Sequence, residues 1–328
     1  MLRSRALTFV VMLTLLPSCS SSDPHPAIGP AVRSISPTGQ VALDSQEPML
    51  FAATDRILVA DLNSLSSVDP STLEVDWTVV VPAYAVVEAF GSYWATDFDG
   101  SLVRRIDPAD GTTLAEIETP GAAPIGAVAV GEELWIAGHH DGRLWRIDPA
   151  TNEEVGRKKV AFAGDSGPMW LASDGTSVYV DIPRTREVVK VDALTAKVVG
   201  RVQMPMGIIP CGQLTIDGAT VWATACFESD RAMRVDFETE DYVVTEPMGV
   251  NSSGAFVAGD LIWFAGFEPD AVSDDTGVLV AVDRVTGEIV DRVRTGSTTD
   301  ALVSAFGSIW MPDQDGIARF DPASLVRE

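Results

Sequence analysis

Short segments in which apolar and polar residues alternate recur along almost the whole chain. Residues 187–191, Glu-Val-Val-Lys-Val, are typical, and the segments are rich in Val, Ile, Thr and Trp. A period of about two predicts half-buried β-strands, whereas amphipathic helices need apolar residues at a spacing of about 3.6. The pattern therefore predicts an all-β chain with few helices.

The strand pattern is repeated seven times. In each copy, a strand that carries Trp or a substitute is followed at a similar spacing by a strand that ends in Asp. The Trp positions are Leu58, Trp94, Trp135, Tyr179, Trp222, Trp263 and Trp310. The Asp positions, 38 to 47 residues apart, are Asp69, Asp107, Asp148, Asp192, Asp236, Asp283 and Asp321. A four-stranded propeller blade takes roughly 40 to 50 residues, so the repeat predicts a seven-bladed β-propeller with four-stranded blades.

Each copy accommodates four strands. In the third copy they are expected at residues 127–130, 134–138, 143–147 and 154–160. We expect the repeated Trp to fill the space between neighbouring sheets, because it buries a large apolar area. We expect the repeated Asp to start a turn by accepting hydrogen bonds from nearby backbone N–H groups. Both positions are therefore interpreted as scaffold.

The two ends of the predicted propeller complement each other. The last copy, residues 301–328, has three strands and almost no fourth, and an unassigned segment, residues 32–43, precedes the first copy. Pairing of the two ends would close the ring and remove open sheet edges. We expect residues 32–328 to form one propeller that is closed by this N-terminal strand.

The first 31 residues have the features of an export signal and a tether. Arg3 and Arg5 precede an apolar run, residues 6–16, that is too short to span a bilayer, and a small residue precedes Cys19. The pattern resembles bacterial lipoprotein signals. It predicts a signal peptide at residues 1–18, a lipid on Cys19, a tether at 19–31 and a location at the outer face of a bacterial membrane. Ordinary secretion with cleavage nearby is the alternative.

The formal net charge of the chain is −24. A chain this acidic is a very poor partner for nucleic acid, whose phosphates need Lys and Arg. It is also repelled by anionic lipid headgroups, so we expect the lipid on Cys19 to be its only hold on the membrane.

The loops expected at one mouth of the central channel are acidic. Asp97 and Asp99 share one such loop, Asp313 and Asp315 share another, and residues 268–275 form a third. These four Asp residues are candidate ligands for Ca²⁺ or Mg²⁺, but Ca²⁺ takes roughly six to eight oxygen ligands, and each pair alone supplies too few. The alternative is that the Asp-Gly sequences form solvated hairpin turns.

Other residues are candidates for ligand binding by position. His139 and His140 are the only histidines after the tether, and they are expected on a turn at the same mouth; an ordinary surface turn is the alternative. The loops that join consecutive blades add Tyr84, Pro124, Ser166, Gly207, Ser252 and Thr299.

Two cysteines flank a predicted hairpin in the fifth copy. If Gly218 and Ala219 form its two-residue loop, the register that places Ile216 opposite Val221 also places Cys211 opposite Cys226. Export to an oxidising compartment makes a cross-strand disulfide between them the expected state. Two free buried thiols are the alternative.

The repeated form of Gly131, Trp135 and residues 146–149, Arg-Ile-Asp-Pro, resembles YncE-type and virginiamycin B lyase-like propeller repeats. This resemblance implies a fold that hosts lyases, lactonases and binding proteins. It also implies that lyase relatives use histidines from separate blades, with acidic residues and Mg²⁺. Residues 222–226 and 263–267 contain no histidine, so streptogramin lyase activity is not expected.

Motifs of the common hydrolases and nucleotide-binding proteins do not occur in the sequence. We therefore predict a non-catalytic binding or scaffold propeller that recognises a protein, peptide or glycan. The alternative is a metal-assisted lyase or lactonase with Asp97, Asp99, Asp313, Asp315 and one of the two histidines around the channel mouth.

Overall fold

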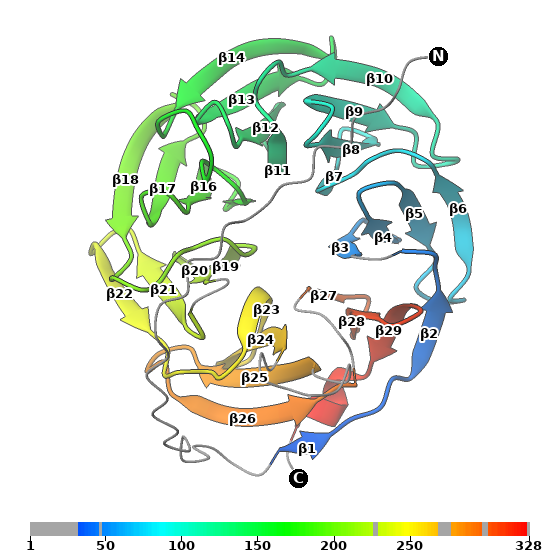
Figure 1. Cartoon of the computed structure of the whole chain (residues 1–328), viewed down its shortest axis with the longest axis vertical. Coiled ribbons are helices and arrows are strands. Elements are labelled where there is room, and N and C mark those ends of the chain that lie inside the picture. Colours follow the sequence, from blue (N-terminus) through cyan, green and yellow to red (C-terminus); the bar gives the residue numbers. More distant parts are fainter. Residues whose placement is uncertain (1–31, 46–47, 226–228, 268–276, 297–300, 327–328) are drawn as a thin grey trace, which may run out of the picture.

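Seven sheets, antiparallel apart from one added parallel strand, are arranged radially around a central axis (Figure 1). The computed structural model describes residues 32–45, 48–225, 229–267, 277–296 and 301–326. Six sheets have four strands and one has a fifth. The predicted seven-bladed β-propeller is confirmed. The predicted signal peptide, Cys19 and tether lie outside the described residues.

The strands follow one another in chain order through the blades. Blade 1 contains β3 (Met49–Ala52), β4 (Ile57–Ala60), β5 (Leu65–Val68) and β6 (Val75–Val79); blade 2 contains β7 (Val86–Ala89), β8 (Ser92–Asp97), β9 (Leu102–Ile106) and β10 (Thr113–Glu118); blade 3 contains β11 (Pro124–Val130), β12 (Glu133–Gly138), β13 (Arg143–Asp148) and β14 (Glu153–Lys159). Blade 4 contains β15 (Leu171–Ser173), β16 (Ser177–Ile182), β17 (Glu187–Asp192) and β18 (Lys197–Gln203); blade 5 contains β19 (Thr215–Asp217), β20 (Thr220–Thr224), β21 (Ala232–Asp236) and β22 (Asp241–Val244). Blade 6 contains β23 (Asn251–Ala258), β24 (Leu261–Phe267), β25 (Gly277–Asp283), β26 (Ile289–Arg294) and β1 (Arg33–Ser34); blade 7 contains β27 (Val303–Ala305), β28 (Ser308–Asp313), β29 (Gly316–Phe320) and β2 (Gly39–Ala42).

Blade 3 shows how closely the repeat predicted the strands. The two middle strands, β12 and β13, extend the predicted ranges by one residue each. The innermost strand, β11, begins three residues earlier than predicted, at Pro124, because an irregularity between Pro124 and Ala127 lets the pairing with β12 continue. Helix is limited to one 3₁₀ turn, η1 (Pro322–Leu325), in the described part of the chain.

The repeated Trp position is buried in every blade. The side chains at these seven positions are at most 3% exposed. Their neighbours on the next strand add a second repeated contact: the Arg105 guanidinium lies 5.2 Å from the centre of the Trp94 ring, and Arg146 lies at the same distance from Trp135. In these two blades, Trp on the second strand and Arg on the third therefore form a cation–π pair, which adds attraction to the burial.

The repeated Asp starts a turn in every blade, as predicted. Its Oδ1 accepts a backbone N–H two or three residues later, for example from Ala150 to Asp148 at 2.8 Å and from Val285 to Asp283 at 2.8 Å. The same bond occurs at the other five positions. These bonds lower the pKa of Asp283, because they stabilise the ionised carboxylate.

The turn is also where one blade contacts the next. Arg105 of blade 2 donates to the carbonyl oxygen of Pro149, which follows the repeated Asp of blade 3, at 2.9 Å. Arg319 of blade 7 donates to the carbonyl oxygen of Pro70 in blade 1 at 3.1 Å. The interface between the last and first blades therefore contains the same contact as an interface between two blades inside the ring.

The N-terminal segment closes the ring as predicted, and it also adds a strand to a second blade, which was not predicted. Strand β2 pairs antiparallel with β29 and completes blade 7, while β1 pairs parallel with β26 as a fifth strand of blade 6 (Figure 1). Arg33 on β1 is ion-paired with Asp291 on β26 at 3.3 Å. Within the described residues, no helix has the length and apolarity needed to span a bilayer.

We predict that Val41→Ala on β2 lowers the free energy of unfolding by about 2 kcal/mol, because the buried Val41 packs with Leu50, Val59 and Trp310 across the closing seam. Urea unfolding followed by Trp fluorescence measures this loss. Ala42→Ser, on the exposed face of the same strand, is the control and should stay within about 0.5 kcal/mol of the wild type. Equal stability of the two variants would mean that β2 is not part of the folded core.

Candidate functional site

Five ring-bearing side chains from three blades meet on one face of the propeller. Tyr84 precedes β7, Phe98 follows β8, His139 and His140 follow β12, and Trp170 precedes β15. We call these five residues the mouth cluster. Loops of this kind lie at one end of the channel, so the mouth cluster stands where the predicted ligand site was expected.

Ring contacts run through the mouth cluster without a break. The Tyr84 ring centre is 6.0 Å from that of Trp170 and 6.0 Å from that of Phe98. Phe98 lies 5.2 Å from His140 and 6.0 Å from His139. His140 is exposed, Tyr84, Phe98 and His139 are half-buried, and Trp170 is buried. The cluster therefore leads from solvent to the wall of the channel.

His139 holds the loop before Trp170 in place. Its Nε2 accepts the N–H of Ser166 at 3.2 Å, and its Nδ1 lies 3.2 Å from the carbonyl oxygen of Pro168. Only the neutral ring with hydrogen on Nδ1 makes both bonds. Burial lowers the pKa of His139 and outweighs the opposing effect of Pro168. Both ring nitrogens therefore make hydrogen bonds within the protein.

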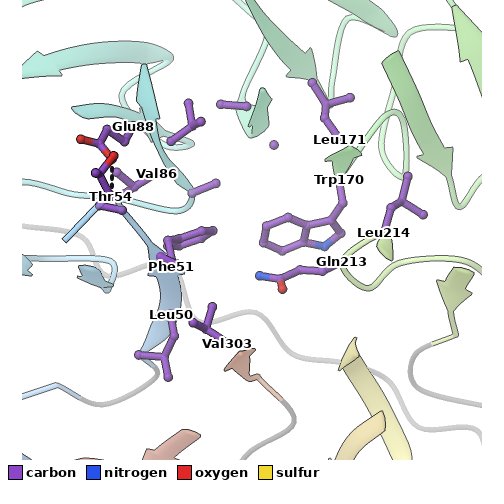
Figure 2. A pocket seen from close by; sticks show the side chains of 16 residues that line it. Leu50, Phe51, Thr54, Val86, Glu88, Trp170, Leu171, Gln213, Leu214 and Val303 are labelled. Carbon is purple, nitrogen blue, oxygen red and sulfur yellow. Dashed lines mark hydrogen bonds between the residues drawn. The ribbon is translucent and has the colours of Figure 1, made fainter. Parts of the chain in front are cut away.

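A cavity of about 460 Å³ lies along the channel next to Trp170 (Figure 2). Innermost strands of several blades supply most of its wall. The lining residues are Leu50, Phe51, Ala52, Ala53, Thr54, Ala85, Val86, Val87, Glu88, Gly126, Ala127, Trp170, Leu171, Gln213, Leu214 and Val303. Its volume falls within the range of small-molecule sites, roughly 300 to 1,000 Å³.

Aromatic rings and one amide define the inside of this cavity. Figure 2 shows the Trp170 ring and the Gln213 amide pointing toward Phe51 across the open space. Trp170 is fixed by a 3.0 Å bond from its Nε1 to the carbonyl oxygen of Cys211. The half-buried Gln213 side chain makes no hydrogen bond to another described residue, whereas the carboxylate of Glu88 accepts the backbone N–H of Thr54. Gln213 is therefore a polar group of the lining that is available to a ligand.

Gly126 permits the close approach of blades 3 and 4 that positions Trp170. The N–H of Gly126 donates to the carbonyl oxygen of Met169 at 2.8 Å. A Cβ at Gly126 would lie 2.6 Å from that oxygen and 3.0 Å from the Cα of Trp170. Glycine is required here because backbone occupies the space that any side chain would enter.

Asp181 is a buried carboxyl group beneath the mouth cluster. Its Oδ1 accepts the N–H of Trp170 at 2.6 Å, and its Oδ2 is buried without a hydrogen-bond partner among the described residues. Thr96 holds the equivalent position in blade 2, where its hydroxyl accepts the N–H of Ala85 at 3.0 Å and donates to the carbonyl oxygen of Ile125 at 2.6 Å. A carboxyl group can donate in the same way only when protonated. Burial raises the pKa of Asp181 to about 8.

The four candidate metal ligands are placed apart or already paired. Asp97 is buried, is ion-paired with Arg104 at 2.6 Å and accepts the N–H of Gly100 at 2.8 Å. Asp313 accepts the amide of Gln40 on the outer strand of blade 7 at 2.5 Å. Asp99 and Asp315 are exposed. Among the described residues, no group of three or more His, Cys, Asp or Glu side chains is placed to hold a metal.

The loop residues selected by position have different surroundings. Tyr84 belongs to the mouth cluster, and Ser166 is exposed beside His139. Ser252 is 1% exposed, and its hydroxyl donates to the carbonyl oxygen of Gly254, so its side chain is not accessible to a ligand. Pro124 is buried and Gly207 is exposed. Thr299 and residues 268–275 lie outside the described residues.

The register used to predict the disulfide holds only near the hairpin loop. Ile216 pairs with Val221 as expected, but Pro210 pairs with Ala225, two residues out of that register. Cys211 is disulfide-bonded, and neither of the other two cysteines lies among the described residues. Pairing of Cys211 with Cys226 therefore stays a prediction.

Phe51, Phe98, Trp170 and Gln213 were not predicted as site residues. Phe98 lies between Asp97 and Asp99, where the carboxylates suggested metal chemistry instead. Trp170 stands outside the repeated Trp position, immediately before the fourth copy, and this departure was the available signal. Nothing in the sequence around Gln213 distinguishes it.

The sequence matches no protein-family model and no curated protein. Solved structures are similar in fold. A catalytically inactive variant of virginiamycin B lyase from Staphylococcus aureus, solved with quinupristin, is 12% identical with a TM-score of 0.69, covering 85% of this chain and 97% of that chain. BamB from Moraxella catarrhalis is 14% identical with a TM-score of 0.61, covering 86% and 96%. Hydrazine synthase from Kuenenia stuttgartiensis is 14% identical with a TM-score of 0.71, covering 87% and 98%.

These similarities concern the fold alone, because the identities are low and the named proteins differ in activity. The expected resemblance to virginiamycin B lyase-like propellers is confirmed at the level of the fold. Similarity to YncE-type proteins stays an expectation.

We predict that Asp181→Asn makes the protein more stable than the wild type at about pH 8, by roughly 2 °C or more in Tm, and nearly equal to it at about pH 4. With its pKa raised to about 8, Asp181 is protonated in the folded state. In the unfolded chain it ionises at about pH 4. The wild type therefore loses stability as pH rises from about 4 to about 8, and the amide has no such loss.

Thermal unfolding across this pH range tests the prediction, with Asp99→Asn as the control at an exposed carboxylate of the same mouth. Parallel curves for Asp181→Asn and the wild type would show that Asp181 ionises normally in the fold.

Proposed function

We propose that the protein is a non-catalytic binding module that takes part of a protein, peptide or glycan ligand into the mouth of its channel. The observation that carries this proposal is the unbroken series of rings from exposed His140 to buried Trp170, which ends at a cavity with an uncommitted Gln213 amide. Aromatic rings favour flat apolar groups, and an amide adds orientation.

Three titratable groups near the mouth are held within the fold, which favours binding over catalysis. A general acid or base needs a titratable atom within reach of substrate. Both nitrogens of His139 contact backbone groups, Asp97 is paired with Arg104, and Asp181 has no exposed surface. The ligand group that fits best is an aromatic side chain or a sugar ring that carries a hydroxyl or amide, because it would stack between Phe51 and Trp170 and bond to Gln213.

The setting of this module is proposed from the N-terminal sequence. We infer export by a signal peptide at residues 1–18 and attachment at the outer face of a bacterial membrane through a lipid on Cys19. Residues 19–31 would then be the tether between the lipid and β1. The acidic chain gives no attraction of its own to anionic lipid.

We predict that Gln213→Ala weakens binding of a ligand selected from peptide and glycan arrays roughly tenfold, because one hydrogen bond inside a partly dry cavity is lost. Isothermal titration calorimetry with the selected ligand measures the effect. Gln203→Ala, which removes the same side chain from the outer strand of blade 4, is the matched control and should bind as the wild type does. A ligand that binds both variants equally would place its site elsewhere.

We predict that Ca²⁺, Mg²⁺ and EDTA leave the Tm of the purified protein unchanged, because the four candidate carboxylates do not gather around one point. A ligand that binds only the folded state raises Tm. A rise with either ion that EDTA reverses would contradict the prediction and favour the metal-assisted lyase or lactonase.

A further inference from the structure

The outer rim of blades 3 and 4 presents apolar and cationic side chains together. Phe162 is 71% exposed and Met206 is 83% exposed. Lys159 and Arg184 are exposed beside them, and Arg186 is half-buried. We call these five residues the rim patch. It lies on the same face as the mouth cluster but contributes nothing to the wall of the cavity.

Direct contacts join the rim patch into one surface. The Lys159 Nζ lies 5.0 Å from the centre of the Phe162 ring. Arg184 donates from Nη1 to the carbonyl oxygen of Ala163, next to Phe162, at 3.1 Å. Arg186, on the same turn as Arg184, contacts the Met206 sulfur through Nη1. Each exposed apolar side chain therefore has a cation against it.

Phe162 is exposed on a loop that the backbone holds firmly. The N–H groups of Val160 and Ala161 both donate to the carbonyl oxygen of Gly142 at 3.0 Å. Further along, the N–H of Gly164 donates to the carbonyl oxygen of His140 at 2.7 Å. The backbone of the loop is hydrogen-bonded on both sides of Phe162, and the large apolar side chain of Phe162 is nevertheless exposed to water. A fixed, exposed aromatic ring is typical of a protein interface.

The cations of the rim patch are not used in ion pairs within the described residues. Lys159, Arg184 and Arg186 form no ion pair with any described residue, whereas the neighbouring Arg157 and Arg201 pair with Glu154 and Glu187. This contrast matters in a chain with a net charge of −24. An acidic partner is repelled by most of the surface and attracted here.

We propose that the rim patch docks an extended acidic segment of a partner protein that carries a large apolar side chain. Arg184 and Arg186 offer the forked donors that match carboxylates, and Lys159 adds a point charge. Phe162 and the flexible Met206 supply the apolar contact. The proposal goes beyond the channel site, because no residue of the rim patch lines the cavity.

The charge of the protein favours an acidic segment over a second copy of the chain or an anionic bilayer as the partner of the rim patch. A second copy of the chain would bring another net charge of −24 toward the first. An anionic bilayer is broad and would meet the acidic surface around the patch as well as the patch itself. A narrow acidic segment meets only the cations, so it gains attraction without that repulsion.

The test uses the full chain and a fluorescein-labelled peptide of glutamates that contains one Leu and one Phe, with binding followed by fluorescence anisotropy. A peptide of the same length with lysine in place of glutamate reports nonspecific association. We expect binding of the acidic peptide alone, weakened by NaCl. Lys159→Glu and Phe162→Ser should each weaken it roughly tenfold.

Matched controls exist on the outer strand of blade 4. Lys197→Glu reverses an exposed lysine at the opposite end of the blade, and Val199→Ser removes an apolar side chain that is 57% exposed. Both should bind as the wild type does, and Gln213→Ala should too, which separates this result from that of the channel. Equal effects of Lys159→Glu and Lys197→Glu would overturn the proposal. So would binding to phosphatidylglycerol vesicles instead of the peptide, or a dimer that Phe162→Ser dissociates.

Discussion

Closure of the ring is the constraint on which the rest of the structure depends. Each sheet leaves an apolar face that only its neighbour can cover, so seven blades are stable together only if the last one meets the first. Strand β2 supplies the missing outer strand of blade 7, and Arg319 then reaches the turn of blade 1 with the contact that Arg105 makes inside the ring. The cavity depends on the same closure, because its wall combines Phe51 of blade 1 and Val303 of blade 7 with residues from the blades opposite.

Repeated and unrepeated residues occupy opposite ends of each blade. The second strand carries the buried Trp near its start, and the third ends in the Asp that caps the turn to the fourth, so the repeated contacts gather at one face. The mouth cluster lies at the other end of the second strand. In the loop that follows the second strand, blade 2 has Phe98, blade 3 has His139 and blade 4 has Arg184. The scaffold can therefore stay constant while the mouth differs from blade to blade.

This division explains what could be predicted from the sequence. Trp135 and Asp148 recur with their neighbours in seven copies, so their burial and their turns were predictable without any structure. The site was not, because Phe51, Trp170 and Gln213 each occur once and meet only after the ring closes. Nor does the local sequence show tertiary partners: Asp97 was interpreted as a candidate metal ligand, and in the fold it is ion-paired with Arg104. The pairing of Pro210 with Ala225 shifted the register from which the disulfide was derived.

The loop between blades 3 and 4 links the two proposed binding surfaces. Phe162 of the rim patch lies near its start and Trp170 of the cavity at its end. Backbone groups of residues 160–170 bond to Gly142, His140 and His139 of blade 3, and then to Asp181 of blade 4. A Cβ on Gly167 would lie 2.0 Å from the carbonyl oxygen of His139. Only glycine therefore fits this close contact between the loop and blade 3. A loop with few alternative conformations loses little entropy when a ligand binds. Half-buried His139 and buried Asp181 thus hold the loop that carries Phe162 and Trp170, the side chains on which the two proposals depend.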